Sequence, residues 1–223
     1  MRIGVISEGH SDRAVIMNVI VGITGLDYSD IIPLRPIYAK DETDKALNDP
    51  KTKSSYSVIQ EECEERNLID DFLAIEEQDF IVLHIDTAEA DRYGVERPDK
   101  KEATYCEDLR NLVIQKMNSW LSIDLSNQTL YAVAIEETDA WVLTLYEEGD
   151  STKYVDAKKR MGSLLSKKGI KFIHDPFDYY SKISKSFSKK KHISNEAITS
   201  QNCSLFLFCK EIEAKVLPKM HLE

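Results

Sequence analysis

Short apolar runs alternate along the chain with longer segments whose apolar residues recur every three or four positions. The runs at 2–7, 79–86 and 128–137 are short and almost uninterrupted, which is typical of strands buried on both faces. A fourth extended run, 31–39, contains Pro33 and Pro36, so we expect an edge strand there at most. The pattern therefore predicts that all strands lie before residue 138.

Segments with a helical period lie between these runs. The period predicts helices over 13–23, 57–75, 107–122 and 138–148, the first of them capped by Asp12. The polar stretch 40–55 has no such period, and we expect a loop. Strands that alternate with helices favour an α/β fold with a mainly parallel sheet of about four strands, covered by helices on both faces.

Length and composition narrow the class of protein. The chain of 223 residues is long enough for one substantial core. No run approaches the roughly 18 apolar residues of a membrane span, and the first residues do not resemble a secretion signal, so we expect a cytoplasmic protein without a membrane partner. The four cysteines form no CxxC pair, which favours reduced thiols over disulfides or a structural zinc.

Charge is distributed unevenly along the chain. Residues 1–150 hold 32 acidic and 14 basic residues, whereas 151–192 hold 3 acidic and 12 basic residues. We therefore expect an α/β metal-binding domain over 1–150 and a basic, mostly helical extension over 151–223 packed on it. Lysines that are merely solvated are the alternative to a polyanion-binding surface. The candidate residues for nucleic-acid binding are Lys158, Lys159, Arg160, Lys167, Lys168, Lys189, Lys190 and Lys191.

Acidic residues follow three of the predicted strands. They are Glu8, with Asp12 shortly after it, then Asp86, Glu89 and Asp91, and finally Glu136, Glu137 and Asp139. The carboxyl ends of parallel strands meet at one edge of a sheet, where carboxylates repel each other unless a cation neutralises them. Oxygen ligands without accompanying histidine or cysteine favour Mg²⁺ or Mn²⁺. Acids that cap helices or remain in water are the alternative.

Two of these acids lie in stretches that resemble a known family. VISEGHSD (5–12) and IVLHIDTAEAD (81–91) resemble the Toprim domain of topoisomerases, primases, ribosomal-RNA maturases and OLD-type nucleases. That family has a Glu after its first strand and an Asp-x-Asp pair after a later one, and Glu8 and Asp86 match those positions. Ala88 stands where the second Asp of the pair is expected, so the resemblance implies that Glu89 or Asp91 supplies the remaining ligand.

Two further segments extend the resemblance over most of the chain. AVAIEETDAWVL (132–143) and NCSLFLFCKEIEAKV (202–216) are similar to segments of the small stand-alone bacterial Toprim-like proteins, which are related to OLD-type nucleases and often lie among phage-defence genes. The resemblance implies a Rossmann-like Toprim fold. It also implies candidate partners other than nucleic acid, namely an ATPase or another defence protein and a second copy of the chain.

The function expected on this basis is Mg²⁺-dependent or Mn²⁺-dependent hydrolysis of DNA or RNA phosphodiesters. His10, beside Glu8, is a candidate general base or phosphate contact, and an incidental turn residue is the alternative. A Toprim-like module that binds without catalysis, as the sensor subunit of a larger complex, is the other function that the sequence allows. The candidate residues are Glu8, Asp86 and His10 for catalysis, Glu8, Asp86, Glu89 and Asp91 for metal binding, and Asp12, Glu136, Glu137 and Asp139 as supporting acids.

Overall fold

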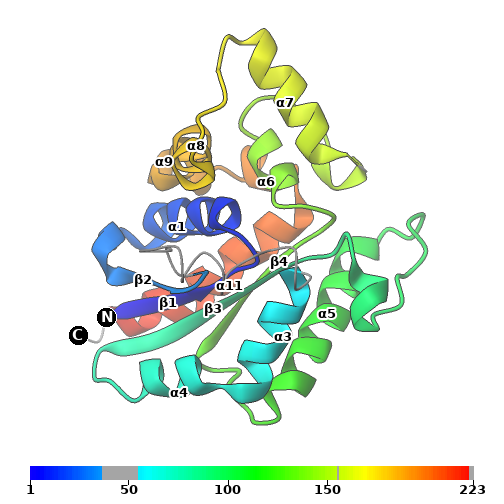
Figure 1. Cartoon of the computed structure of the whole chain (residues 1–223). Coiled ribbons are helices and arrows are strands. Elements are labelled where there is room, and N and C mark those ends of the chain that lie inside the picture. The colour runs from blue at the N-terminus through cyan, green and yellow to red at the C-terminus, as the bar shows by residue number, and fades with distance from the viewer. Residues whose placement is uncertain (37–54, 155, 221–223) are drawn as a thin grey trace.

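The computed structural model describes residues 1–36, 55–154 and 156–220. Within them, four parallel strands form one sheet in the order β2, β1, β3, β4, which confirms the α/β class and the parallel sheet (Figure 1). The strands are β1 (Arg2–Ile6), β2 (Ile31–Arg35), β3 (Gln78–Asp86) and β4 (Thr129–Ala134). The strand containing Pro33 lies at an edge, as predicted, because proline cannot donate a ladder hydrogen bond. The expected loop 40–55 falls outside the described residues except for its last position, as do residues 37–39.

Helices cover both faces of the sheet (Figure 1). One face carries α1 (His10–Thr24), α8 (Pro176–Ile183) and α11 (Cys203–Met220), and the other carries α3 (Ser55–Glu65), α4 (Asn67–Leu73) and α5 (Tyr105–Leu121). Successive side chains of a strand point to opposite faces, so Val82 of β3 packs toward α1 while Ile81 and Leu83 pack toward α5. By the same alternation, His84 and Asp86 lie on the α1 side.

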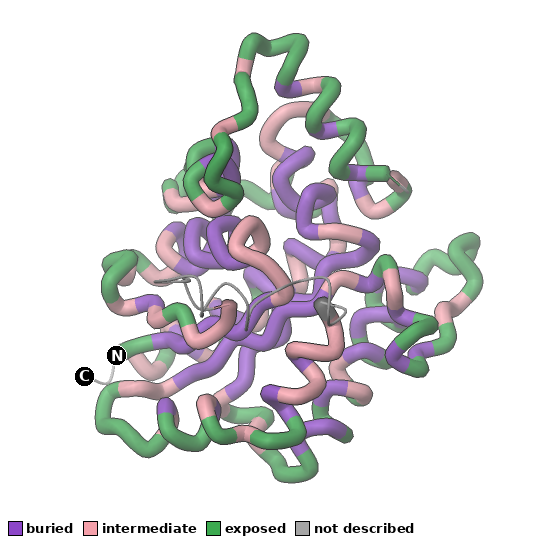
Figure 2. Tube along the Cα trace, viewed as in Figure 1, coloured by how far each residue is buried: buried purple, intermediate pink, exposed green. Residues whose placement is uncertain are grey.

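Helix α1 is buried almost all round, including Arg13 and Asn18 (Figure 2). It is enclosed by the sheet on one side and by α8, η4 (Lys185–Ser188) and α9 (Lys190–Ile193) on the other. A Cβ atom at Gly22 would lie 1.9 Å from the carbonyl oxygen of Phe187, so only glycine permits this approach. The segment that forms α1 is apolar on every side because α1 is a middle layer between the sheet and the helices α8, η4 and α9.

The C-terminal part is mostly helical and shares its core with α1. Its remaining helices are η3 (Ser151–Lys153), α7 (Ala157–Lys167) and α10 (Glu196–Thr199). Ser204 of α11 accepts hydrogen bonds from Trp141 Nε1 at 2.8 Å and from the amide of Ile135 at 3.2 Å. The two segments 132–143 and 202–216 therefore contact each other directly. In the part of the chain that the structure describes, no helix combines the length and the apolar character needed to cross a membrane.

Four local predictions were wrong. Arg66, in the left-handed conformation with φ 56°, interrupts the expected helix 57–75, and α3 and α4 form in its place. The expected strand 128–137 ends at Ala134, and the expected helix 138–148 is the short α6 (Asp139–Leu143). The N-cap of α1 is Gly9, so Asp12 lies within the first turn instead of capping the helix. The other helices of the described residues are η1 (Tyr28–Asp30) and η2 (Ala90–Tyr93).

Candidate functional site

The ends of β1 and β3 meet at the carboxyl edge of the sheet. The strands pair in register, with Ile6 opposite Leu83, so the chain leaves β1 alongside the last residues of β3. Ser7 holds the exit of β1 because its amide donates to the carbonyl of Arg35 at 3.1 Å and its hydroxyl donates to the carbonyl of Gly9 at 3.0 Å. The amide of Asp86 in turn donates to Oε1 of Glu8 at 3.1 Å. The two acids expected to lie together at this edge are therefore adjacent.

The side chain of Asp86 is held by α6 and by its own strand. Oδ1 of Asp86 accepts hydrogen bonds from the amide of Thr138 at 3.1 Å and from its hydroxyl at 3.0 Å, and it lies 3.3 Å from Nε2 of His84. Nε2 of His84 also lies 2.8 Å from the Thr138 hydroxyl. Because this hydroxyl donates its one proton to Asp86, His84 acts as the donor to Thr138. These contacts all reach Oδ1 and fix the orientation of the carboxylate.

Asp12 lies close to Asp86, and we call Asp12, Asp86 and Glu8, which accepts from the amide of Asp86, the acid cluster. One ligand atom each of Asp12, His84 and Asp86 lies within 4.8 Å of the other two. Asp12 reaches this position because it is in the first turn of α1, which starts directly beyond β1. Carboxylate oxygens are the donors that Mg²⁺ and Mn²⁺ prefer, so the donor set fits such an ion.

Burial and neighbouring charge shift the pKa values of the groups in this region. Burial lowers the pKa of His84, but the hydrogen bond to Asp86 and the charges of Asp12, Asp86 and Glu8 outweigh burial and raise it to about 9. Burial raises the pKa of Asp86. Nδ1 of His84 is buried and has no hydrogen-bond partner among the described residues. Perturbed titratable groups gathered at a strand end are typical of functional sites.

His10 lies at the start of α1 and contacts Arg13. Its Nδ1 is 2.9 Å from a guanidinium nitrogen of Arg13. Burial and the charge of Arg13 lower the pKa of His10, so the neutral imidazole is favoured near neutral pH. Because a guanidinium only donates, Nδ1 of His10 accepts from Arg13 and the neutral ring carries its proton on Nε2, which suits a contact to a phosphate oxygen better than the role of a general base.

The two acids expected to replace the missing Asp at position 88 lie in the segment after β3. Glu89 is paired with Arg92 at 2.5 Å, and Asp91 is exposed in η2. Neither belongs to a group of three close potential ligands among the described residues, whereas Asp12 does. Asp12, which we had expected only as a supporting acid, is therefore better placed than Glu89 or Asp91 to act together with Asp86.

The three acids after β4 have separate roles. Glu136 is buried in a left-handed conformation with φ 62°, and its Oε1 lies 2.9 Å from Arg97 and 2.7 Å from Lys100. Glu137 accepts a hydrogen bond from the amide of Lys158 at 3.2 Å. These two acids therefore stabilise the turn after β4 and the start of α7.

Asp139 is buried in α6 and faces α8. Its Oδ1 accepts a hydrogen bond from the hydroxyl of Tyr180 at 2.7 Å. Burial raises the pKa of Asp139 to about 7, although the hydrogen bond from Tyr180 and the charge of Lys158 oppose the shift. Asp139 therefore titrates near neutral pH next to the acid cluster.

The basic residues are spread over two surfaces. Lys158, Lys159, Arg160 and Lys167 belong to α7, whose outer surface is exposed, and Lys168 follows it (Figure 2). Arg160 is paired with Glu147 at 2.5 Å and lies over the ring of Tyr154. Lys189, Lys190 and Lys191 are exposed around the start of α9. Arg160 is therefore neutralised by a carboxylate, whereas the exposed lysines remain available to a polyanion.

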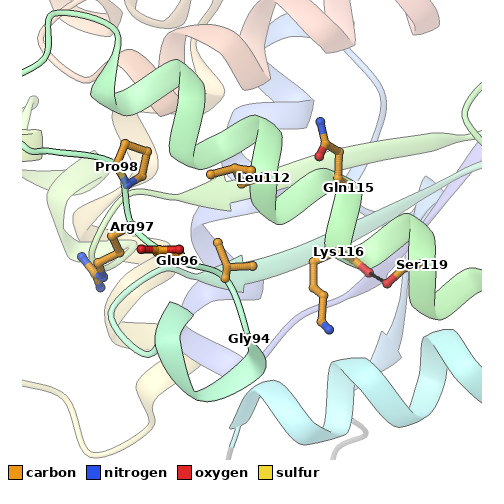
Figure 3. A pocket seen from close by; sticks show the side chains of 9 residues that line it. Gly94, Glu96, Arg97, Pro98, Leu112, Gln115, Lys116 and Ser119 are labelled. Carbon is orange, nitrogen blue, oxygen red and sulfur yellow. Dashed lines mark hydrogen bonds between the residues drawn. The ribbon is translucent and has the colours of Figure 1, made fainter.

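A pocket of about 580 Å³ lies away from the acid cluster, between the segment 94–98 and α5 (Figure 3). Its lining includes Leu112, Lys116 and the stem of Arg97. Arg97 donates to the carbonyl of Thr87 and pairs with Glu136, so it supports the segment after β3. The pocket contains neither Glu8 nor Asp86, and the chemistry described above therefore lies outside it.

Three residues that the sequence did not suggest as site residues are central to this geometry. Thr138 and Tyr180 have no charge, and His84 lies within an apolar strand. The alternation of side chains along β3 was the available signal, because it places His84 on the same face as Asp86. No sequence pattern signals Tyr180, which is 41 positions from its partner Asp139.

Comparison with models of known protein families, with curated proteins and with solved structures finds no match to this chain.

Proposed function

We propose that the chain is a Toprim-like phosphodiesterase that hydrolyses DNA or RNA with the help of a divalent cation. The observation that carries the proposal is the convergence of Glu8, Asp12 and Asp86 at the carboxyl edge of a parallel sheet, where ligands of α/β proteins bind. Asp12 and Asp86 lie close together with Glu8 beside them, and the single charge of a protonated His84 offsets only part of their mutual repulsion, so a bound cation would stabilise the group. The resemblance of the segments around Glu8 and Asp86 to the Toprim domain supports the same function.

In this proposal each residue of the region has a distinct role. Glu8, Asp12 and Asp86 hold the cation, with Asp12 in the role first expected of Glu89 or Asp91. Mg²⁺ or Mn²⁺ bound there would stabilise the negative charge of a phosphodiester under attack by water. Thr138 and His84 orient Asp86 through the contacts at its Oδ1. His10, whose Nδ1 accepts from Arg13, donates from Nε2 to a phosphate oxygen.

The basic surfaces bring the substrate to this edge. The acid cluster repels a polyanion, so a nucleic acid needs cations close by. The exposed lysines of α7 and of the start of α9 supply them. A role in phage defence rests on the resemblance alone.

A module that binds without catalysis is the second candidate function. It is favoured by the contacts at Oδ1 of Asp86, since two hydrogen bonds from Thr138 and the neighbouring His84 satisfy that oxygen with protein groups. Ala88, which leaves the second family acid missing, favours it as well.

A cleavage assay separates the two functions. Purified protein is incubated with plasmid, single-stranded DNA and tRNA, in EDTA and after addition of Mg²⁺ or Mn²⁺. We expect cleavage only with the divalent cation, together with saturable Mg²⁺ binding in a calorimetric titration. Mg²⁺ binding without cleavage of any of the three substrates would favour the binding module, and the absence of both would overturn the metal site.

A further inference from the structure

A second pocket, of about 490 Å³, lies between α7, the segment 169–172 and α8. Figure 1 shows α7 and α8 standing apart from the sheet on the side of α6. The lining combines aromatic rings with lysines and contains no acidic residue. This composition differs from that of residues 1–150, in which acidic residues outnumber basic ones.

The aromatic wall of this pocket is open to solvent. Phe172 is 67 % exposed, which is unusual for so large an apolar side chain. Its ring leans on Tyr179, with 4.9 Å between the ring centroids, and Tyr179 contacts Tyr180 with 5.6 Å between centroids. A ring held in place by a second ring offers a flat face on which another planar group can stack.

The lysines of the pocket are not paired with acids. Neither Lys158 nor Lys171 has a carboxylate within 4.0 Å among the described residues. The ammonium group of Lys171 therefore keeps its attraction for an anionic partner, and that of Lys158 is shared with the buried Asp139. Lysine beside an exposed aromatic ring is the combination by which proteins bind single-stranded nucleic acids, with the phosphates on the cations and the bases on the rings.

Hydrogen bonds connect residues of the pocket with residues next to the acid cluster. Tyr180 lines the pocket and donates to Asp139 at 2.7 Å. The amide of Lys158 donates to Glu137 at 3.2 Å. Glu137 and Asp139 flank Thr138, which holds Asp86. A strand lying in the pocket would therefore have its next phosphate near the carboxyl edge of the sheet.

We propose that this pocket binds an unpaired base of a single-stranded nucleic acid. The base stacks on Phe172, and the flanking phosphates contact Lys158 and Lys171. The inference rests on the proposed function and deepens it, because it assigns single strands as the substrate class. A base within a duplex is already stacked on both faces, so a duplex cannot use this surface.

Binding is measured in EDTA by fluorescence anisotropy, so that no cleavage interferes. The probes are a ten-nucleotide oligothymidylate, the oligouridylate of the same length, an abasic ten-nucleotide strand with the same phosphates, and a duplex. We expect the parent to bind either base-containing strand at least about fivefold more tightly than the abasic one. Phe172→Ala should remove this preference, whereas Ile75→Ala, which trims another exposed apolar side chain, should retain it.

The lysines should act on all single strands alike. Lys158→Ala and Lys171→Ala should each weaken binding to the base-containing and abasic strands equally and reduce the slope of log affinity against log salt by about 0.7. Tighter binding of the oligouridylate would assign RNA as the preferred strand. Tighter binding of the oligothymidylate would assign DNA.

The inference is overturned if the parent binds the abasic strand or the duplex as tightly as the base-containing strands, if it binds none of them, or if Phe172→Ala leaves the base preference unchanged. These results are independent of catalysis. A protein that keeps the base preference but never cleaves contradicts the proposed hydrolysis only, and one that cleaves without a base preference contradicts this inference only.

Discussion

The amide of Asp86 donates a hydrogen bond to Oε1 of Glu8 at 3.1 Å, across 78 positions of sequence. This contact joins the ends of two neighbouring strands and brings two carboxylates to one edge of the sheet. Asp12 approaches Asp86 from α1, so a third acid joins Glu8 and Asp86 at this edge. The first two predictions concern this arrangement.

Glu8→Gln should abolish cation-dependent cleavage, with a loss of at least about 100-fold, while the fold remains intact. The amide side chain retains an oxygen that can accept the bond from Asp86, but it removes one charge from the acid cluster. Stability without metal should therefore be unchanged or higher. Cleavage assays and thermal unfolding in EDTA measure the two effects.

Glu89→Gln is the matched control, because Glu89 is exposed and paired with Arg92. It should leave cleavage within about twofold of the parent, as expected for a surface ion pair of little energetic weight. Full activity of a folded Glu8→Gln variant would exclude Glu8 from the mechanism. Loss of activity in Glu89→Gln would return Glu89 to the list of ligands.

Thr138→Val should weaken both the fold and Mg²⁺ binding. It removes the hydroxyl that contacts Asp86 at 3.0 Å and His84 at 2.8 Å in a buried position. We expect a loss of roughly 1–3 kcal/mol in the free energy of unfolding. Since Asp86 loses an orienting contact, Mg²⁺ affinity should fall roughly tenfold or more.

Thr144→Val provides the comparison, because that buried hydroxyl donates to the backbone carbonyl of Trp141 and makes no other hydrogen bond among the described residues. It should cost less than about 1 kcal/mol and leave Mg²⁺ affinity unchanged. Denaturant unfolding and calorimetric Mg²⁺ titration provide both values. Equal effects of the two variants would show that Thr138 has no special part in holding Asp86.

Asp139 should make stability depend on pH. Burial raises its pKa to about 7 in the folded protein, so the folded state binds more protons than the unfolded state between about pH 4 and 7. The contribution of the protonated Asp139 to the free energy of unfolding is therefore fully present below pH 4 and is lost as the pH rises through 7. The charges facing Asp139 are Lys158, Glu137 and Asp12, with Tyr180 as its hydrogen-bond donor.

The comparison of Asp139→Asn with the parent isolates this contribution. The parent loses the contribution of Asp139 as the pH rises, whereas Asp139→Asn has no titrating group there. A pKa shift of one unit corresponds to about 1.4 kcal/mol, so the free energy of unfolding of the variant relative to the parent should increase by roughly 3–4 kcal/mol from pH 4 to pH 8. Denaturant unfolding in EDTA across this range measures the difference. A difference independent of pH would mean that the carboxyl titrates alike in the folded and unfolded chain.

Gly22→Ala should destabilise the packing of the C-terminal part on α1. The added methyl would lie 1.9 Å from the carbonyl oxygen of Phe187, so the backbone of η4 has to move. We expect a cost of at least about 2 kcal/mol. Gly162→Ala, in α7 with open space around it, should instead raise stability by about 0.5–1 kcal/mol, since alanine favours a helix. Similar effects of both substitutions on thermal unfolding would contradict this close approach.

The combined substitution of Lys189, Lys190 and Lys191 by Glu should weaken nucleic-acid binding for all sequences alike. These exposed lysines would release counterions on contact with phosphates, so the variant should show a shallower dependence of log affinity on log salt. The same charge change at Lys101, Lys116 and Lys210 controls for net charge. If both triple variants bind as the parent does, the lysines of α9 are a solvated surface.

The sequence by itself determined the class of fold and the two acids that define the edge. Apolar runs of strand length alternating with helical segments specify a parallel sheet, because each strand must be covered on both faces. Glu8 and Asp86 stand at strand ends whose positions depend on short-range hydrophobic patterning. Their meeting follows from topology, since parallel strands end at the same edge.

Only the tertiary structure decided which other groups join them. Glu136 and Arg66 adopt left-handed conformations that no local period signals, which is why one helix and one strand end earlier than predicted. Asp12 reaches Asp86 because α1 packs against the sheet, and Tyr180 reaches Asp139 because α8 packs against α1. Such contacts depend on side-chain packing between elements distant in sequence. The period of hydrophobic residues predicts which face of an element is buried, but it does not predict which polar group lies opposite that face.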